Sequence, residues 1–316
     1  MNDRRPTLSC LYRPGLASLA ALLGLVAGCS GPAAPPTPPA DWQPSLATWR
    51  SEREAGLKRP NGWLSLVGLW WLQPGETPFG SDPSLPIALP AGSAPERAGA
   101  LVLEGDAVTL RVAPDAVVAV NGSPARDGMT LAPDATGKPD VVTVGRVSFT
   151  VIRRGDRLGV RAKDPENPGL AQFSGLSWYA PDPAWRIPAR FERAAAPKQI
   201  TVPSAGGVEQ PMWALGVARF SIDGREHALI PLGDSPDDEE LFFVFKDRTT
   251  GEETYGAGRF LDADPPGPDG RFVLDFNRAY SPPCAFTPFA TCPLPPKENA
   301  LDVAVRAGER KYAGGH

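Results

Sequence analysis

The chain has 316 residues, of which 42% are hydrophobic, and its 32 basic and 36 acidic side chains give a formal net charge of −4. This length is sufficient for one large domain or two modest domains with a hydrophobic core. The negative charge, and a sequence without basic clusters interleaved with aromatic residues, argue against a nucleic-acid partner. His227 and His316 are the two histidines, too few for a histidine-rich zinc site.

Residues 1–28 predict a secretory signal peptide, because three arginines precede an apolar run over 16–26, and the segment ends in Val-Ala-Gly-Cys at 26–29. The run is shorter than the ~20 residues that a membrane-spanning helix needs, so cleavage is favoured over a permanent span. The last four residues resemble a bacterial lipobox, which implies that Cys29 becomes the lipid-bearing, palmitoylated N-terminus. The alternative is an ordinary cleavage site beside a chance cysteine.

Residues 29–40 predict a tether, because repeated proline favours an extended, solvated chain. Ser30 follows the lipidated cysteine, and resemblance to Gram-negative lipoproteins implies sorting to the outer membrane, facing the periplasm, if the cell has one. We therefore expect a cell-envelope protein whose membrane contact is the lipid anchor.

The first element after the tether is a helix. Asp41 predicts its cap, residues 42, 46, 49 and 53 follow at helical spacing, and the helix is expected to stop near Gly56. Residues 62–72 are apolar and contain three tryptophans. Core packing is the commoner use of such a segment, and the floor of a ligand pocket is the alternative.

Beyond residue 90 the pattern changes to short β-type runs. Residues 108–112 and 117–120 precede the hairpin signal Asn121-Gly122, and residues 147–151 turn back into 158–162. Residues 217–222 and 225–232 flank a second hairpin signal, Asp223-Gly224. Further strands are expected at residues 241–246, 255–261, 271–277 and 301–306.

These patterns predict a mainly β fold, with two antiparallel β-sandwich or barrel-like lobes and a short N-terminal helix. Proline and tryptophan at 181–185 mark the seam. The N-terminal lobe, with the leading helix, is predicted to cover residues 41–185, and the C-terminal lobe residues 186–316.

Cys284 and Cys292 lie eight positions apart on a proline-rich stretch. In an oxidising exported compartment such a pair favours a disulfide. Two buried free thiols and a thiolate metal site remain as alternatives, although the chain offers few partners for a metal, and no metal is expected.

Several long motifs near the C-terminus are distinctive. They are KDRTTG (246–251), TYGAGRFL (254–261), DFNRAYSPPCAF (275–286), ATCPLPPKEN (290–299) and AGE (307–309). Together they resemble the bacterial domain-of-unknown-function family numbered 1684, and GWLSLVGL (62–69) and RLGVRAKD (157–164) resemble the same family. The likeness spans residues 42–310 and implies no catalytic assignment. Ser281 departs from the pattern, where asparagine is expected.

The same region holds the candidate ligand-binding residues. In a strand, Asp275 and Asn277 project from one face, about 7 Å apart, and Arg259 meets Asp275 if their two strands pair. Arginine binds a carboxylate or phosphate, a carboxylate acts as general base, and tyrosine stacks on a ring. The alternative for each residue is structural: a paired charge, a turn-forming side chain or a cap. The candidates are Arg259, Asp275, Asn277, Arg278, Tyr280, Glu298 and Asn299.

The leading hypothesis is a lipoprotein module that binds a small polar or anionic ligand, or an envelope protein, at this polar cluster. The alternatives are an envelope hydrolase with Asp275 or Glu298 as general base, and a purely structural lipoprotein. Catalytic residues are not assigned, because the sequence has no Gly-x-Ser-x-Gly elbow, Walker loop or dinucleotide fingerprint, and no cofactor is expected. An oxygen-only calcium or magnesium site at Asp247, Asp275, Asn277 and Glu298 is a weaker possibility.

Overall fold

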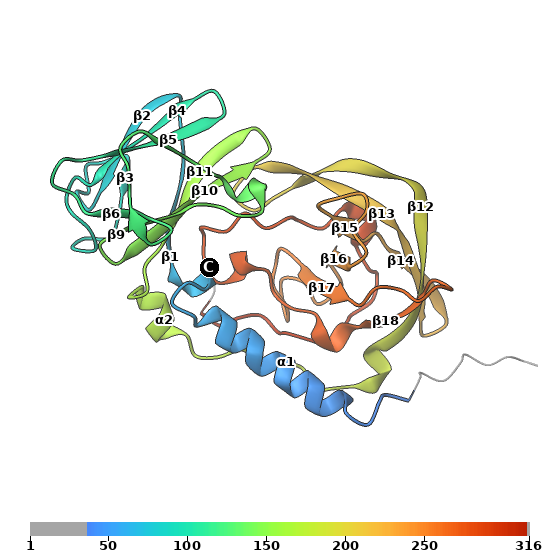
Figure 1. Ribbon diagram of the computed structural model, residues 1–316. Helices are drawn as coiled ribbons and strands as arrows, with labels where there is room; N and C mark the ends of the chain where they lie inside the picture. The colour runs from blue at the N-terminus through green and yellow to red at the C-terminus, as the bar shows by residue number, and fades with distance from the viewer. Residues whose placement is uncertain (1–36, 315–316) are drawn as a thin grey trace, which may run out of the picture. The chain divides into compact units, whose positions relative to one another are not determined.

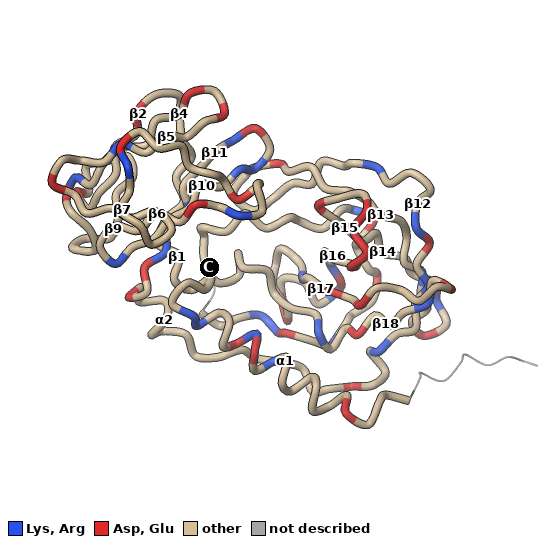
Figure 2. The backbone as a smooth tube through the Cα atoms, in the orientation of Figure 1, with Lys and Arg blue, Asp and Glu red and all other residues tan. Residues whose placement is uncertain are grey.

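The computed structural model describes residues 37–314, which belong to one compact unit (Figure 1). The predicted signal peptide, Cys29, most of the tether and His316 lie outside the described residues. Within residues 37–314, no helix combines the length and apolar character needed to cross a bilayer. Acidic and basic side chains are interspersed along the described chain (Figure 2).

The fold is mainly β, as predicted, and its strands form three sheets. The described residues contain two α-helices, α1 (Trp42–Leu57) and α2 (Pro168–Gln172). Short 3-10 turns are η1 (Trp63–Ser65), η2 (Asp134–Thr136), η3 (Pro183–Trp185), η4 (Phe276–Arg278), η5 (Pro283–Ala285) and η6 (Lys297–Asn299).

The first sheet has six strands in the order β1-β11-β10-β9-β6-β7, and the second has five in the order β3-β2-β4-β5-β8. All their pairings are antiparallel except β2 with β3. The first sheet comprises β1 (Leu66–Trp71), β6 (Val118–Val120), β7 (Ser123–Pro124), β9 (Val141–Val144), β10 (Val147–Arg154) and β11 (Arg157–Lys163). The second comprises β2 (Gly75–Gly80), β3 (Ile87–Ala88), β4 (Gly99–Glu104), β5 (Ala107–Val112) and β8 (Met129–Leu131).

These two sheets form a sandwich with one shared hydrophobic core. The alternation of β10 buries Val147, Phe149 and Val151 on one face, as the period of two requires. Phe149 meets Phe79 of the second sheet edge to face, with ring centroids 5.3 Å apart. The predicted antiparallel meander therefore closes its apolar face against another sheet.

The third sheet has the order β17-β16-β15-β13-β12-β18, with β14 paired to β13. It curls until β17 and β18, the strands at its two ends, touch and enclose a second core. The result is a half-closed barrel. Its strands are β12 (Arg186–Pro203), β13 (Glu209–Ile222), β14 (Arg225–Leu229), β15 (Leu232–Gly233), β16 (Leu241–Phe245), β17 (Arg259–Ala263) and β18 (Arg271–Asp275).

Both predicted two-residue hairpins are confirmed. Asn121 and Gly122 have φ of 52° and 78°, and Asp223 and Gly224 have 51° and 75°. Positive φ at both central positions gives the turn whose twist matches that of the flanking strands, and Asn-Gly and Asp-Gly tolerate it best.

Two local predictions are wrong, and a third is right in position only. Residues 301–306 are irregular, because this segment bonds to single groups of residues 246–248 rather than to a continuous partner strand. The strand expected from residue 255 begins only at Arg259, after a turn in which the Gly258 amide donates to the Tyr255 carbonyl and Gly258 has φ of 95°. Asp41 stands at the N-cap of α1, but its side chain makes no capping hydrogen bond.

Candidate functional site

Arg259 is fully buried and lies away from Asp275, so the predicted meeting of these two residues is wrong. Their strands lie at opposite ends of the third sheet and share no register. The Arg259 guanidinium donates to Asp247 Oδ2 at 2.6 Å, to the Val305 carbonyl at 2.9 Å and to the Ala307 carbonyl. Burial lowers the pKa of Arg259 and Asp247 opposes that shift. Arg259 therefore holds the irregular C-terminal segment to the barrel.

Asn277 and Asn299 are also fully buried ties between segments. The Asn277 side chain exchanges two hydrogen bonds, each of 2.9 Å, with the backbone of Asp182. Asn299 does the same with Ile230, at 2.7 and 2.9 Å, and donates to the Val244 carbonyl at 3.0 Å. In both cases the side-chain amide pairs with backbone groups in the way that a neighbouring β-strand would.

Asp275 ends β18 and contacts helix α1. Its carboxylate accepts from Trp42 Nε1 at 2.7 Å, and from the amide and side chain of Asn277 at 3.1 and 2.9 Å. Arg186 Nε lies 3.3 Å from it. Both carboxylate oxygens of Asp275 therefore accept hydrogen bonds.

Glu298 is exposed and lines a separate hollow together with His227. Asp247 is paired to Arg259 and Asp275 to Trp42, so the four oxygen ligands proposed for a calcium or magnesium site do not converge. Within residues 37–314, no three histidine, cysteine or carboxylate side chains are placed to hold a metal ion.

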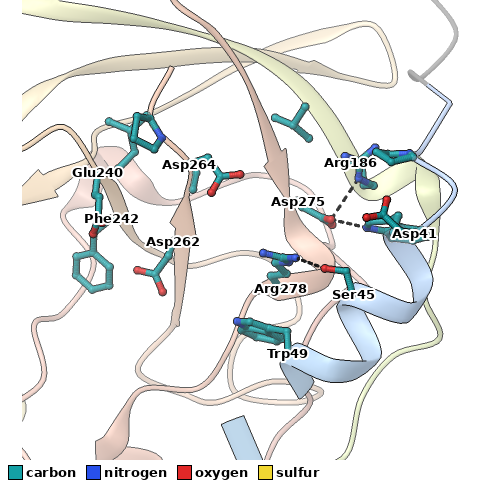
Figure 3. Close-up of a pocket in the computed structure, with 16 residues that line it drawn as sticks. Asp41, Ser45, Trp49, Arg186, Glu240, Phe242, Asp262, Asp264, Asp275 and Arg278 are labelled. Atoms are coloured by element: carbon teal, nitrogen blue, oxygen red, sulfur yellow. Dashed lines mark hydrogen bonds and ion pairs between the residues drawn. The ribbon is translucent and has the colours of Figure 1, made fainter. Parts of the chain in front are cut away.

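Two of the predicted residues, Asp275 and Arg278, do line a common pocket of about 450 Å³ (Figure 3). One wall is α1, which contributes Trp42, Ser45 and Trp49, and Arg278 donates to Ser45 Oγ at 3.1 Å. The opposite wall comes from β16, β17 and the residues that flank them. It carries Glu240, Phe242, Asp262 and Asp264.

The pocket has a surplus of negative charge, because it is lined by five carboxylates and two arginines. Arg186 is already paired with Asp275. The carboxylates of Glu240, Asp262 and Asp264 form no ion pair with another described residue. The free groups that face the cavity are therefore mainly hydrogen-bond acceptors.

Tyr280 reaches the pocket through Asp262, since its hydroxyl donates to Asp262 Oδ2 at 2.8 Å. Partial burial raises the pKa of Asp262, and the nearby Glu240 adds to the shift, while Tyr280 and Arg53 oppose it. Asp262 thus links the pocket to Tyr280 through a hydrogen bond, and it is a pocket carboxylate with a raised pKa.

Behind Tyr280 lies a charged pair that joins α1 to the end of the chain. Arg53 Nε lies 2.5 Å from the fully buried Glu309, and Arg53 also donates to the Ser281 carbonyl at 2.7 Å. Its guanidinium packs over the Tyr280 ring, 4.5 Å from the centroid. Burial raises the pKa of Glu309, and Arg53 opposes this shift.

The sequence interpretation missed Trp42, Arg53, Glu240 and Asp262. A partial signal existed for the first two, because residues 42, 46, 49 and 53 share one helical face. That spacing shows that a face is buried, but it does not say which segment covers it. Glu240 and Asp262 carried no comparable signal.

The predicted disulfide between Cys284 and Cys292 is not formed in the structure, where both are buried free thiols. The two are nevertheless neighbours, since the Cys284 amide donates to Cys292 Sγ at 3.3 Å. The alternative of two buried free thiols describes this state.

Comparison with solved structures gives partial likenesses. An uncharacterised protein of Haloarcula marismortui is 34% identical over 48% of this chain and 82% of its own, with a TM-score of 0.40. An FHA domain studied for phosphothreonine-dependent interactions is 16% identical over 30% and 92%, with a TM-score of 0.22. The FHA1 domain of yeast Rad53 is 18% identical over 37% and 70%, with a TM-score of 0.19. At such scores the FHA likenesses say nothing of what this chain binds.

No curated protein matches the chain. Residues 171–310 match the profile of the family described as Protein of unknown function (DUF1684). The matched stretch contains all the distinctive C-terminal motifs, while residues 62–69 and 157–164 lie outside it. The chain belongs to the DUF1684 family.

Proposed function

We propose that the chain is a binding protein whose pocket beside α1 takes a small polar ligand that is neutral or positively charged. The observation that carries the proposal is the convergence of two tryptophans and several unpaired carboxylates on one open cavity of about 450 Å³. These groups come from α1, from β17 and from the residues that flank β16 and β17, so the N-terminal helix and the third sheet are both needed to assemble them.

The chemistry of the lining favours this ligand class over an anion. Carboxylates accept hydrogen bonds from hydroxyl and ammonium groups, and charge-assisted bonds of this kind are the stronger ones. Indole faces attract cations and also pack against apolar ring faces. An anionic ligand would meet the unpaired Glu240, Asp262 and Asp264 with only Arg278 free to offset them.

The hydrolase alternative has less support from the geometry. Asp275 accepts from Trp42 and Asn277 and is paired with Arg186, which leaves no free oxygen to take a proton from substrate. Glu298 lies in a different hollow. A purely structural role is the outcome expected if no ligand is found.

We also infer export and lipid anchoring at Cys29 from the signal layout of residues 1–29. This assignment places the pocket in the cell envelope, on the periplasmic side of the outer membrane in a Gram-negative cell. In that oxidising compartment we expect Cys284 and Cys292 to join as a disulfide.

The test is a thermal-shift screen of the full chain in mild detergent, against neutral sugars and polyols, polyamines such as spermidine, and dicarboxylates. The proposal predicts that a sugar or an amine raises Tm, and that Asp262→Asn weakens this effect at least about fivefold, as loss of one charge-assisted bond does.

Asp156→Asn is the matched control, because Asp156 lies in an exposed turn of the sandwich. Stabilisation by dicarboxylates alone, or equal effects of the two substitutions, would refute the proposed ligand class. A complete lack of response across the three groups would favour the structural alternative.

A further inference from the structure

The buried thiols of Cys284 and Cys292 lie at the two ends of one short loop, residues 284–292. They are 7% and 5% exposed, and the amide of one donates to the sulfur of the other at 3.3 Å. A hydrogen bond from the Cys292 thiol lowers the pKa of the Cys284 thiol. The two cysteines therefore lie side by side within the folded chain.

Both ends of the loop are held in place by other segments. The Tyr255 hydroxyl donates to the Cys284 carbonyl at 2.9 Å. The Ala205 amide donates to the Cys292 carbonyl at 2.8 Å. The backbone at each end of the loop is therefore held by a hydrogen bond to another segment.

The loop of residues 284–292 also contacts the sandwich. Thr291 Oγ1 accepts from Arg161 Nη2 at 2.9 Å and from Arg154 Nε at 3.0 Å. Arg161 Nε also donates to the Phe289 carbonyl at 3.2 Å. These arginines belong to β11 and β10, and burial lowers the pKa of Arg161 to about 10.

We propose that Cys284 and Cys292 are a redox-responsive dithiol. Their disulfide fastens the loop of residues 284–292, which contacts β10 and β11 of the sandwich. This inference does not rest on the pocket and holds whatever the pocket binds.

The oxidant is a low-molecular-weight disulfide such as oxidised glutathione. The Cys284 thiolate attacks one glutathione sulfur, which breaks the oxidant's S–S bond and releases a glutathione thiolate. The deprotonated Cys292 then attacks the mixed disulfide and releases the second glutathione. In total, two protein thiols lose two protons and two electrons, and one glutathione disulfide becomes two thiols.

The first test is peptide mapping of the native full chain after treatment with oxidised glutathione. Trypsin releases residues 279–297 as one peptide that holds both cysteines, while Cys10 and Cys29 fall elsewhere. An intramolecular disulfide lowers the mass of that peptide by about 2 mass units, which dithiothreitol reverses. Two free thiols, or glutathione retained on either cysteine, would overturn the proposal.

The second test asks whether the bond fastens the loop. Oxidation is expected to raise Tm by about 5 °C and to slow amide exchange of residues 284–292 and of β10 and β11. The Cys284→Ser/Cys292→Ser variant should show neither change after the same treatment. A disulfide that forms without altering amide exchange in these segments would refute the proposal that it fastens the loop.

Discussion

Polar residues that stand close together in this sequence differ sharply in what they do. Glu298 is exposed, whereas its neighbour Asn299 is fully buried and makes hydrogen bonds to two distant segments. Asp275 binds helix α1 and also lines the pocket, while Asn277 ties the chain to Asp182. Residue type and spacing singled out all of these positions. Only the contacts in the folded chain separate residues that line the pocket from residues that hydrogen-bond to other segments.

Asn299 provides a test of that distinction. Asn299→Ala leaves the Ile230 amide and two buried carbonyls without partners, which is expected to lower the free energy of unfolding by about 2–4 kcal/mol. Glu298→Ala is the adjacent control and should change it by less than about 0.5 kcal/mol. Urea denaturation measures both, and similar losses for the two variants would contradict the assignment.

At the scale of elements, helix α1 illustrates what the sequence predicts and what it does not. Helical spacing and the following glycine predicted its extent to within about two residues. Its side-chain hydrogen-bond partners come from positions 275–309, more than 200 residues away, and periodicity carries no information on such contacts. The two hairpins were predictable because their turn residues are local requirements, whereas the irregular segment 301–306 depends on distant groups.

The pairing of α1 with the C-terminal segment gives a pH-dependent prediction. Arg53→Met leaves Glu309 buried without its cation, and the loss is expected to reach about 3–5 kcal/mol at pH 8. The folded-state pKa of Glu309 is already raised and rises further in the variant. The folded variant therefore takes up a proton as pH falls. The free energy of unfolding that it loses relative to the unchanged chain becomes smaller towards pH 5.

Chemical denaturation of Arg53→Met and the unchanged chain at the two pH values measures this difference. Arg248→Met is the control, because its partner Asp302 is exposed and such pairs contribute about 0–1 kcal/mol. A deficit that is equal at both pH values would show that Arg53 acts through packing rather than through the charge of Glu309.

At the scale of the whole molecule, a closed sandwich and a half-closed barrel each have their own core. The fold class was predictable because period-two alternation and turn residues recur along the chain. The pocket was not, because its walls come from three parts of the sequence, and only β18 and the residues after it had been singled out. The excess of carboxylates in the pocket depends on β16 and β17 lying opposite α1, which the sequence pattern does not indicate.

The proposed anchor makes a prediction about the complete protein in its cell. Cys29→Ser is expected to abolish palmitate labelling and to release the protein from the membrane fraction. Cys10→Ser, within the predicted signal peptide, should leave labelling unchanged. Labelling that persists in Cys29→Ser would contradict the lipobox assignment.

The proposed pocket is tested most directly by the NMR signals of the tryptophan indoles, assigned by Trp→Phe substitutions, during titration with the sugar or amine that stabilises the chain. A ligand in the pocket is expected to shift the signals of Trp42 and Trp49 selectively, because these two indoles line it. Shifts confined to other tryptophans, such as Trp63 or Trp71 of the N-terminal half, would place the ligand elsewhere and refute the proposed site.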